Sequence, residues 1–209
     1  RRPLDYALRE LSDPLGGFWC GQDADSDGVE GKYYTFTLDE IIQVLGVEKG
    51  RRFAAAFDIT DEGNFEGVNI PNLLKSNDLE TDFAEERRRL YEYRRKRTRL
   101  HLDDKLLLSW NAMMIAAFSV LFRVSRDETY LGAAQTAQSL IEERLCSGRQ
   151  LYTSMRGNKR ADRAFLDDYA YYVAALIELY DSTLDTRYLK RAEELCREAV
   201  TRFADAGNG

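Results

Sequence analysis

The order of apolar and polar positions predicts a mostly helical chain. Residues 103–123 are apolar almost all round a helix, which is typical of a buried helix, whereas 127–146 carries apolar residues on one face only. The same order then returns, because 167–180 is nearly all apolar and 185–203 is amphipathic. The pattern therefore predicts buried helices that alternate with helices covering them.

A shift of 58 positions aligns the two helix pairs. It places Asp127-Glu-Thr-Tyr-Leu on Asp185-Thr-Arg-Tyr-Leu and Ala134 on Ala192, which indicates a repeated helical hairpin. Tyr6 to Leu11 resembles the end of a covering helix from a further copy. We expect a mainly α fold, a partial (α/α)6 toroid with small β-hairpin excursions, in which inner helices are ringed by outer ones.

We expect residues 1–209 to form a single domain, about half of such a toroid. Residues 1–37 are predicted to hold the end of an outer helix and a β-hairpin, 38–100 a helical insertion, and 101–148 and 163–209 the two repeats. Within the insertion, Thr37 and Glu40 predict a capped helix over 38–45, followed by helices near 48–57 and 79–98. The sequence begins with Arg1 and not Met, so we expect an excised piece of a longer protein, whose cut edges could self-associate through exposed apolar faces.

The stretch GGFWCGQDADSDGVEGKYYTFT between 16 and 37 supports two interpretations. Asp23, Asp25, Asp27 and Gly28 match the opening of a calcium-binding EF-hand loop, but Tyr34 stands where that loop needs a bidentate Glu. The flanking segments alternate like strands. The sequence therefore favours a polar hairpin turn at the mouth of the toroid, and weak cation binding at its tip is an open alternative.

Composition excludes several classes of function. A net charge of −6 argues against general affinity for nucleic acid or anionic lipid, and the apolar runs are too short for a bilayer span. Three scattered cysteines suit a reducing compartment, and one histidine makes a zinc or iron site improbable. We expect a cytoplasmic protein with no metal and no cofactor.

Polar residues at the starts of the two buried helices are the candidate site. Paired carboxylates, a lysine and aromatic walls in one pocket would suit a sugar. The candidate catalytic residues are Asp104, Lys105, Asp168 and Asp25, and the candidate substrate-binding residues are Asp23, Asp103, Trp110, Asn111, Tyr169 and His101. The alternative is structural: the acids cap helices, Trp110 packs in the core, Asn111 has a buried hydrogen-bond partner and His101 lies in a loop.

Four ordered motifs carry a family resemblance: GGFWCGQDADSDGVEGKYYTFTLDEIIQVLG, GNFEGVNI, HLDDKLLLSWNAMMIAA and FLDDYAYYVAALIELYDSTLD. Together they resemble the YyaL-type, spermatogenesis-associated thioredoxin-domain proteins. The resemblance implies a thioredoxin-like domain followed by a six-hairpin toroid similar to N-acylglucosamine 2-epimerases and several glycosidases, of which this chain would be the first half. Ala112 stands where the family pattern usually has Gly. No settled activity follows from the resemblance.

Two functions are therefore carried forward. The first is a carbohydrate-active toroid, epimerase- or glycosidase-like, in which Asp25, Asp104 and Asp168 converge on one cleft that takes a sugar ligand. The second is a non-catalytic scaffold or client-binding domain for the attached thioredoxin-like domain.

Overall fold

The computed structural model describes residues 1–76, 78, 80–205 and 207 and confirms a mainly α chain. It divides into two compact units, one made of 1–21 and 103–209 and the other of 22–102. The predicted insertion, 38–100, lies within the second unit. Each unit is described by itself below, and the assignment of 1–209 to one domain stays a prediction.

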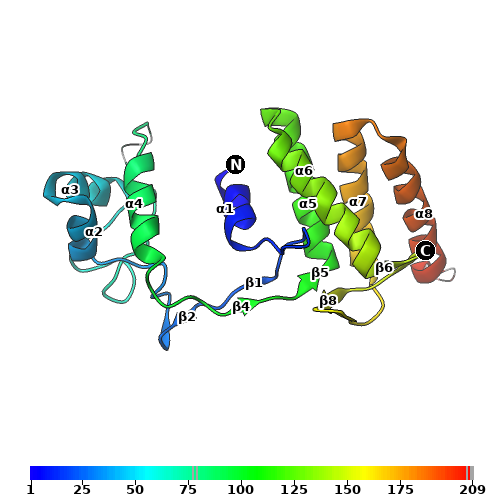
Figure 1. Ribbon diagram of the computed structural model, residues 1–209, viewed down its shortest axis with the longest axis horizontal. Coiled ribbons are helices and arrows are strands. Elements are labelled where there is room, and N and C mark those ends of the chain that lie inside the picture. The colour runs from blue at the N-terminus through cyan, green and yellow to red at the C-terminus, as the bar shows by residue number, and fades with distance from the viewer. Residues whose placement is uncertain (77, 79, 206, 208–209) are drawn as a thin grey trace. The chain divides into compact units, whose positions relative to one another are not determined.

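The first unit is built from two helical hairpins (Figure 1). They are α5 (Leu108–Ser125) with α6 (Glu128–Leu140), which continues as a π-helical turn η1 (Ile141–Leu145), and α7 (Leu166–Thr183) with α8 (Thr186–Phe203). Arg126 and Leu184 take the same left-handed conformation between the helices, with φ of 58° and 57°. Asp127 and Asp185 then accept hydrogen bonds from the next turn at 3.1 and 3.0 Å. The predicted repeat is confirmed in its turns and caps.

The core of this unit lies where α5 and α7 pack on each other and on their covering helices. Ile115, Phe118, Tyr172 and Leu176 are fully buried there, among other apolar residues of all four helices. The ring of Phe118 stacks on that of Phe18 at 5.3 Å, so the segment after α1 (Arg2–Glu10) belongs to the same core. Burial of this apolar surface is the main stabilising contribution.

Helix α5 is less buried than its composition predicts. Trp110, Met113 and Val120 are 51%, 42% and 43% exposed, so the expectation of a helix buried on every side, with Trp110 in the core, is wrong. By length and composition alone α5 could cross a membrane, a test that core helices of soluble proteins also pass. In this chain α5 packs against α6 and α7, and only one stripe of it meets solvent.

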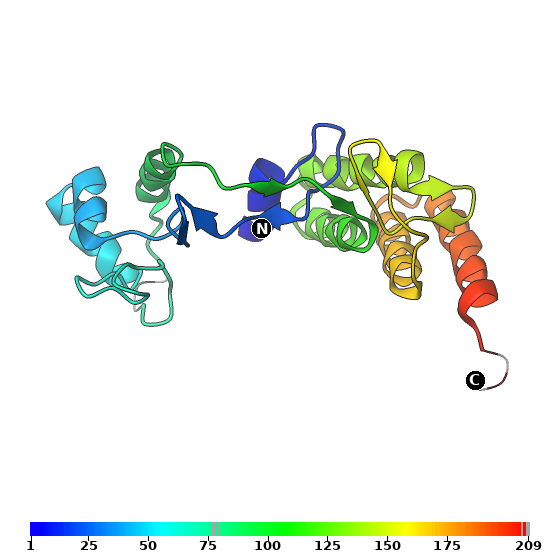
Figure 2. The ribbon, with the colours of Figure 1, turned by 90° about the horizontal axis from the view of Figure 1, so that it is seen from below.

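Short strands lie where α5 and α7 begin, at the lower end of these helices in Figure 1 and again beside that end in Figure 2. Hairpin β6 (Cys146–Ser147) with β7 (Gln150–Leu151) follows the π-helical turn. Strand β8 (Ser154–Arg156) then pairs with both β5 (Leu106–Leu107) and β9 (Lys159–Arg160). The predicted β-excursion after the covering helix is confirmed. Helix α5 starts at Leu108 and not at 103, because 106–107 are paired in this sheet.

The second unit is a small helical cluster. It contains α2 (Leu38–Leu45), α3 (Val47–Ala56) and α4 (Ala84–Arg94) around the buried rings of Phe53 and Phe83 and the partly buried ring of Phe57, whose centroids lie 4.3 to 5.6 Å apart. Both hydrogen bonds of the predicted Thr37–Glu40 capping box are present, at 3.1 and 3.0 Å. Helix α4 is shorter than predicted. Strands β1 (Gly21–Gln22) and β4 (Leu102–Asp103) lie where the chain passes between the two units.

The acidic tip of the second unit is a tight hairpin. Strands β2 (Asp25–Ser26) and β3 (Val29–Glu30) are joined by Asp27 and Gly28, both at positive φ, as in the turn type that Asp-Gly favours. The predicted hairpin is therefore confirmed at its tip. Its aromatic flank is not a strand, because Tyr34 and Thr35 donate backbone hydrogen bonds back to Gly31 and close turns.

Candidate functional site

Charged side chains gather just before α5. Lys105 Nζ lies 3.1 Å from Asp103, and Arg156 of β8 pairs with Asp104. The bond from Lys105 holds the pKa of Asp103 below its usual range. These four side chains are partly or fully solvent-accessible, so their pairs can open to a ligand at little cost.

Trp110 stands two residues inside α5 and is half exposed, the most solvent-accessible large side chain in the first turns of this helix. Trp19, in contrast, is held by a hydrogen bond from its indole nitrogen to Asp13 at 2.9 Å. The half-exposed indole of Trp110 offers a flat apolar surface, and the ion-paired side chains that precede α5 in the sequence offer hydrogen-bonding groups. This combination is what small-molecule sites commonly use.

Asn111 is engaged in the fold. Its side chain is 1% exposed, accepts a hydrogen bond from Phe18 N at 2.7 Å and donates to the carbonyl oxygens of Phe18 and Leu107 at 3.0 and 2.9 Å. Gly16 and Gly17 allow this approach: a Cβ on Gly17 would lie 2.4 Å from the side chain of Leu140. The amide therefore pins the segment after α1 to α5, as its burial in an apolar helix requires.

Asp168 and Tyr169 are likewise held by the fold. Asp168 is buried at the start of α7, accepts from Phe165 N at 3.0 Å and is hydrogen-bonded to Ser109 of α5. Burial raises its pKa, against the opposing effect of those hydrogen bonds. Tyr169 is fully buried, and its hydroxyl accepts from Leu151 N at 3.2 Å and donates to Arg149 O at 3.1 Å.

Three candidates lie in the other unit, at the acidic tip and its surroundings. Asp23 and Asp25 are exposed, and Asp25 N donates to the Asp23 carboxylate at 3.3 Å. His101 is exposed, and its carbonyl oxygen accepts from Asp23 N at 2.8 Å. Asp27 pairs with Lys32 at 2.8 Å, which lowers the pKa of Asp27. The convergence of Asp25 with Asp104 and Asp168 stays a prediction.

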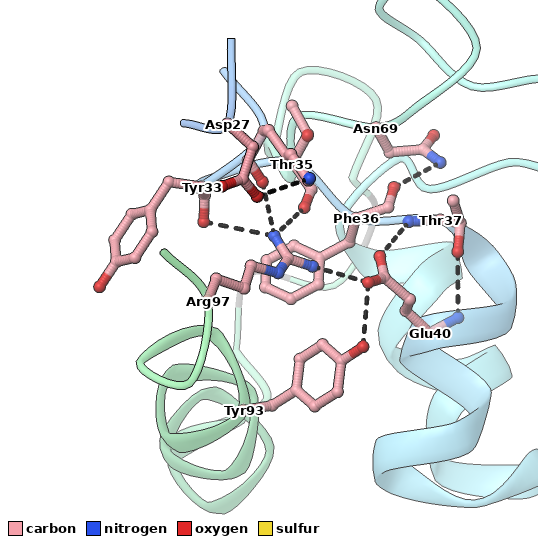
Figure 3. Close-up of polar contacts among 10 residues, drawn as sticks. Asp27, Tyr33, Thr35, Phe36, Thr37, Glu40, Asn69, Tyr93 and Arg97 are labelled. Carbon is pink, nitrogen blue, oxygen red and sulfur yellow. Dashed lines mark hydrogen bonds and ion pairs between the residues drawn. The ribbon is translucent and has the colours of Figure 1, made fainter. Parts of the chain in front are cut away.

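The sequence did not reveal how the basic residues that follow α4 are used. Figure 3 shows Arg97 donating to the carbonyl oxygens of Tyr33 and Thr35 and to the carboxylate of Glu40, over distances of 3.3, 2.6 and 2.9 Å. The side chain of Arg97 is 15% exposed, and it also donates to the carbonyl oxygen of Lys32 at 2.8 Å. Tyr93 also donates to Glu40, and burial raises the pKa of Tyr93. Arg97 therefore ties the segment after the hairpin to α2. Its signal in the sequence was hidden within a run of four basic residues, 94–97.

A polar pocket of about 410 Å³ lies beside Arg97. Its walls include both members of two ion pairs, Lys32 with Asp27 and Arg97 with Glu40, which neutralise each other. A second hollow, of about 340 Å³, lies between α7 and α8 and is almost entirely apolar. Among residues 1–76, 78, 80–205 and 207 no group of three or more His, Cys, Asp or Glu side chains is placed to hold a metal ion.

The hairpin repeat defines the class of protein: a mainly α chain built from repeated helical hairpins, in each of which an outer helix covers an inner one. No family model matches the chain. It is similar to spermatogenesis-associated protein 20 of Homo sapiens, at 26% identity over 99% of this chain and 32% of that protein, and equally to the protein of Mus musculus. It is 28% identical to the uncharacterized protein B0495.5 of Caenorhabditis elegans over 97% of this chain and 34% of that protein. These relatives confirm the resemblance that the motifs predict.

The chain spans about a third of the length of the curated relatives it matches. Among solved structures, it is similar to a cellobiose 2-epimerase from Bacillus thermoamylovorans B4167, with a TM-score of 0.48 and 13% identity over 98% of this chain and 54% of that one. It is also similar to a D-mannose isomerase, with a TM-score of 0.45 and 16% identity over 93% of this chain and 47% of that one. At this level, the similarity says nothing about chemistry.

Proposed function

We propose that this chain is part of a carbohydrate-active toroid, epimerase- or glycosidase-like, in a longer cytoplasmic protein that also carries a thioredoxin-like domain. The observation that carries the proposal is the half-exposed Trp110 in the first turn of α5, which follows the ion-paired Asp103, Asp104 and Lys105 closely in the sequence. An indole face stacks on the apolar face of a pyranose ring, and the neighbouring carboxylates accept hydrogen bonds from its hydroxyl groups. The site would need no metal or cofactor.

The candidates differ in what they could do at this site. Asp104 and Lys105 have solvent access, so they are the better candidates for direct acid–base contact with a sugar. Asp168 is buried against the ends of two helices, and its raised pKa reflects that burial. Asn111 and Tyr169 support the backbone of the site through their own hydrogen bonds. We therefore assign them to positioning and not to substrate contact.

A ligand screen on the full-length protein tests the proposal. A panel of mono- and disaccharides and nucleotide sugars is compared by thermal shift, and a specific sugar should raise the melting temperature. Trp110→Ala should weaken that sugar's binding at least about tenfold, as expected for loss of an aromatic contact. Val124→Ala, at the other end of α5, is the matched control and should bind as the unmodified protein does.

Turnover separates catalysis from binding. Any sugar that binds is then incubated with the protein and its product followed by NMR, with Asp104→Asn as the test variant. A product that the variant fails to form supports the enzyme. If no sugar binds, or if Trp110→Ala binds unchanged, the proposal is wrong and the non-catalytic scaffold is the better account.

A further inference from the structure

The apolar groove between α7 and α8 corresponds, through the hairpin repeat, to the surface of α5 and α6 on which α7 packs. Its walls on α7 include Leu166, Ala170 and Val173, and its walls on α8 include Cys196, Val200 and Phe203. Val200 is 61% exposed. Such an exposed apolar surface on a folded helix pair is a mark of an interaction site.

The hairpin repeat tells what normally covers these positions. Moved back by 58 residues, the α7 walls correspond to Leu108, Ala112 and Ile115 of α5, all fully buried. The α8 walls correspond to Gln138, Glu142 and Leu145 at the end of the α6 segment, none of which is exposed. In the first hairpin, these positions are covered by α7 and by the strands before it. The groove is therefore where the next such helix would lie.

We infer that the groove binds the inner helix of a further hairpin of the same repeat, within the longer polypeptide. This rests on the proposal that the chain is part of a larger toroid, but not on the proposed sugar chemistry. The curated relatives are about three times as long as this chain, which leaves ample sequence for such a hairpin. The contact would continue the α5–α7 interface by one repeat.

A second copy of this chain is a poorer occupant. Its α5 is the inner helix that would have to enter the groove, but α1 already lies beside its α6 as the preceding outer helix. The contact between successive outer helices is made by equivalent tyrosines. The hydroxyl of Tyr130 on α6 donates to Asp5 of α1 at 2.6 Å, and the hydroxyl of Tyr188 on α8 accepts from the amide of Gln135 on α6 at 3.5 Å. On docking, α1 of the second copy would therefore compete for the place of α8.

The groove also specifies the chemistry of its occupant. In the first hairpin, the hydroxyl of Tyr172 donates to Glu142 at 2.6 Å and accepts from Gln138 at 3.3 Å. The repeat replaces these two polar partners by Val200 and Cys196. A buried hydroxyl without partners costs about 1–3 kcal/mol. The occupant helix should therefore carry an apolar side chain, and not tyrosine, at the position equivalent to Tyr172.

Cys196 gives a direct test, because it is an exposed thiol in the wall of the groove. N-ethylmaleimide labelling is followed by peptide mass spectrometry in the 209-residue chain and in the full-length protein. We expect Cys196 to react at least about tenfold more slowly in the full-length protein, because covering a groove blocks access. Equal rates would overturn the inference, and so would protection in the short chain that rises with its concentration, which indicates a second copy.

A substitution in both lengths of protein checks the same point without labelling. Val200→Asp should leave the melting temperature of the short chain nearly unchanged, because its side chain meets solvent there, and lower that of the full-length protein by at least about 5 °C. Val47→Asp, at a similarly exposed valine of the other unit, is the control and should be neutral in both. Equal effects of Val200→Asp in the two lengths would contradict the inference. Failure of sugar binding leaves these outcomes untouched.

Discussion

The amide of Asn111 should be among the most important polar groups for the stability of the first unit. We consider Asn111→Leu, which keeps nearly the same volume and removes every hydrogen bond of the side chain. The substitution leaves the N–H and C=O of Phe18 buried without their partners on α5. The core contacts of this position are kept, so the loss is chiefly one of hydrogen bonding.

The structure sets the size of the effect. Two buried backbone groups lose partners, at about 1–3 kcal/mol each, so the expected loss is about 2–6 kcal/mol. Domains are usually stable by only about 5–15 kcal/mol. The substitution should therefore remove a large part of the stability of this unit. The segment around Phe18, whose ring stacks on Phe118, should loosen first.

Tryptophan fluorescence is the right assay, because both tryptophans of the chain, Trp19 and Trp110, lie in the unit that contains Asn111. Urea unfolding followed by this signal reports on that unit alone. Gln135→Leu is the matched control, since this amide is only partly buried and its bond with Tyr188 is long, at 3.5 Å. It should cost less than about 1 kcal/mol. A loss below that value for Asn111→Leu would refute the structural role given to this residue.

Three further predictions address single side chains. Arg97→Leu should speed amide exchange of residues 32–40 about tenfold or more by mass spectrometry, because four hydrogen bonds to that region are lost, whereas the exposed Lys96→Leu should not. Asp168→Asn should stabilise the first unit against urea at neutral pH. Because burial raises the pKa of Asp168, the contribution of its carboxyl group to stability is present below the pKa of the unfolded state and is lost as the pH rises through the pKa of the folded state. A gain in the free energy of unfolding that fails to shrink towards low pH contradicts this. Cys146, whose pKa burial raises to about 12, should resist iodoacetamide at pH 8 until urea unfolds the chain, and rapid native labelling would contradict its burial.

Periodicity predicted the elements that depend on local chemistry and repetition. The two hairpins, the capping box at Thr37 and the Asp-Gly turn of the acidic tip all follow from residue types at fixed spacing. The cap of α6 is Asp127, although Ser125 with Glu128 three residues later has the spacing of a capping box, because the carboxylate of Asp127 is the one that reaches the next turn. The choice between caps two residues apart depends on side-chain geometry that spacing alone does not supply.

Partners distant in the sequence were beyond prediction. Nothing near Asn111 indicates that its amide would meet Phe18, 93 positions away, and nothing near Asp104 points to Arg156. The alternative that placed Trp110 in the core was wrong for a related reason. A stripe of an apolar helix is buried only if another element covers it, and composition does not say whether one does.

The two inner helices, α5 and α7, carry different side chains in their first turn although their later turns are alike, and the repeat explains this difference. Asn111 and Tyr169 are equivalent positions with unlike side chains, yet each holds the segment that follows the preceding outer helix: Asn111 binds the backbone of Phe18, and Tyr169 binds that of Arg149 and Leu151. In the later repeat, that segment continues through β8 and β9 into α7. In the earlier one, the whole unit of residues 22–102 stands between the pinned segment and α5. An insertion at this point leaves the core intact because the hydrogen bonds of Asn111 fix the backbone of Phe18 before the chain enters the insertion. We therefore expect that loss of the Asn111 amide disturbs the first unit more than changes within the insertion do.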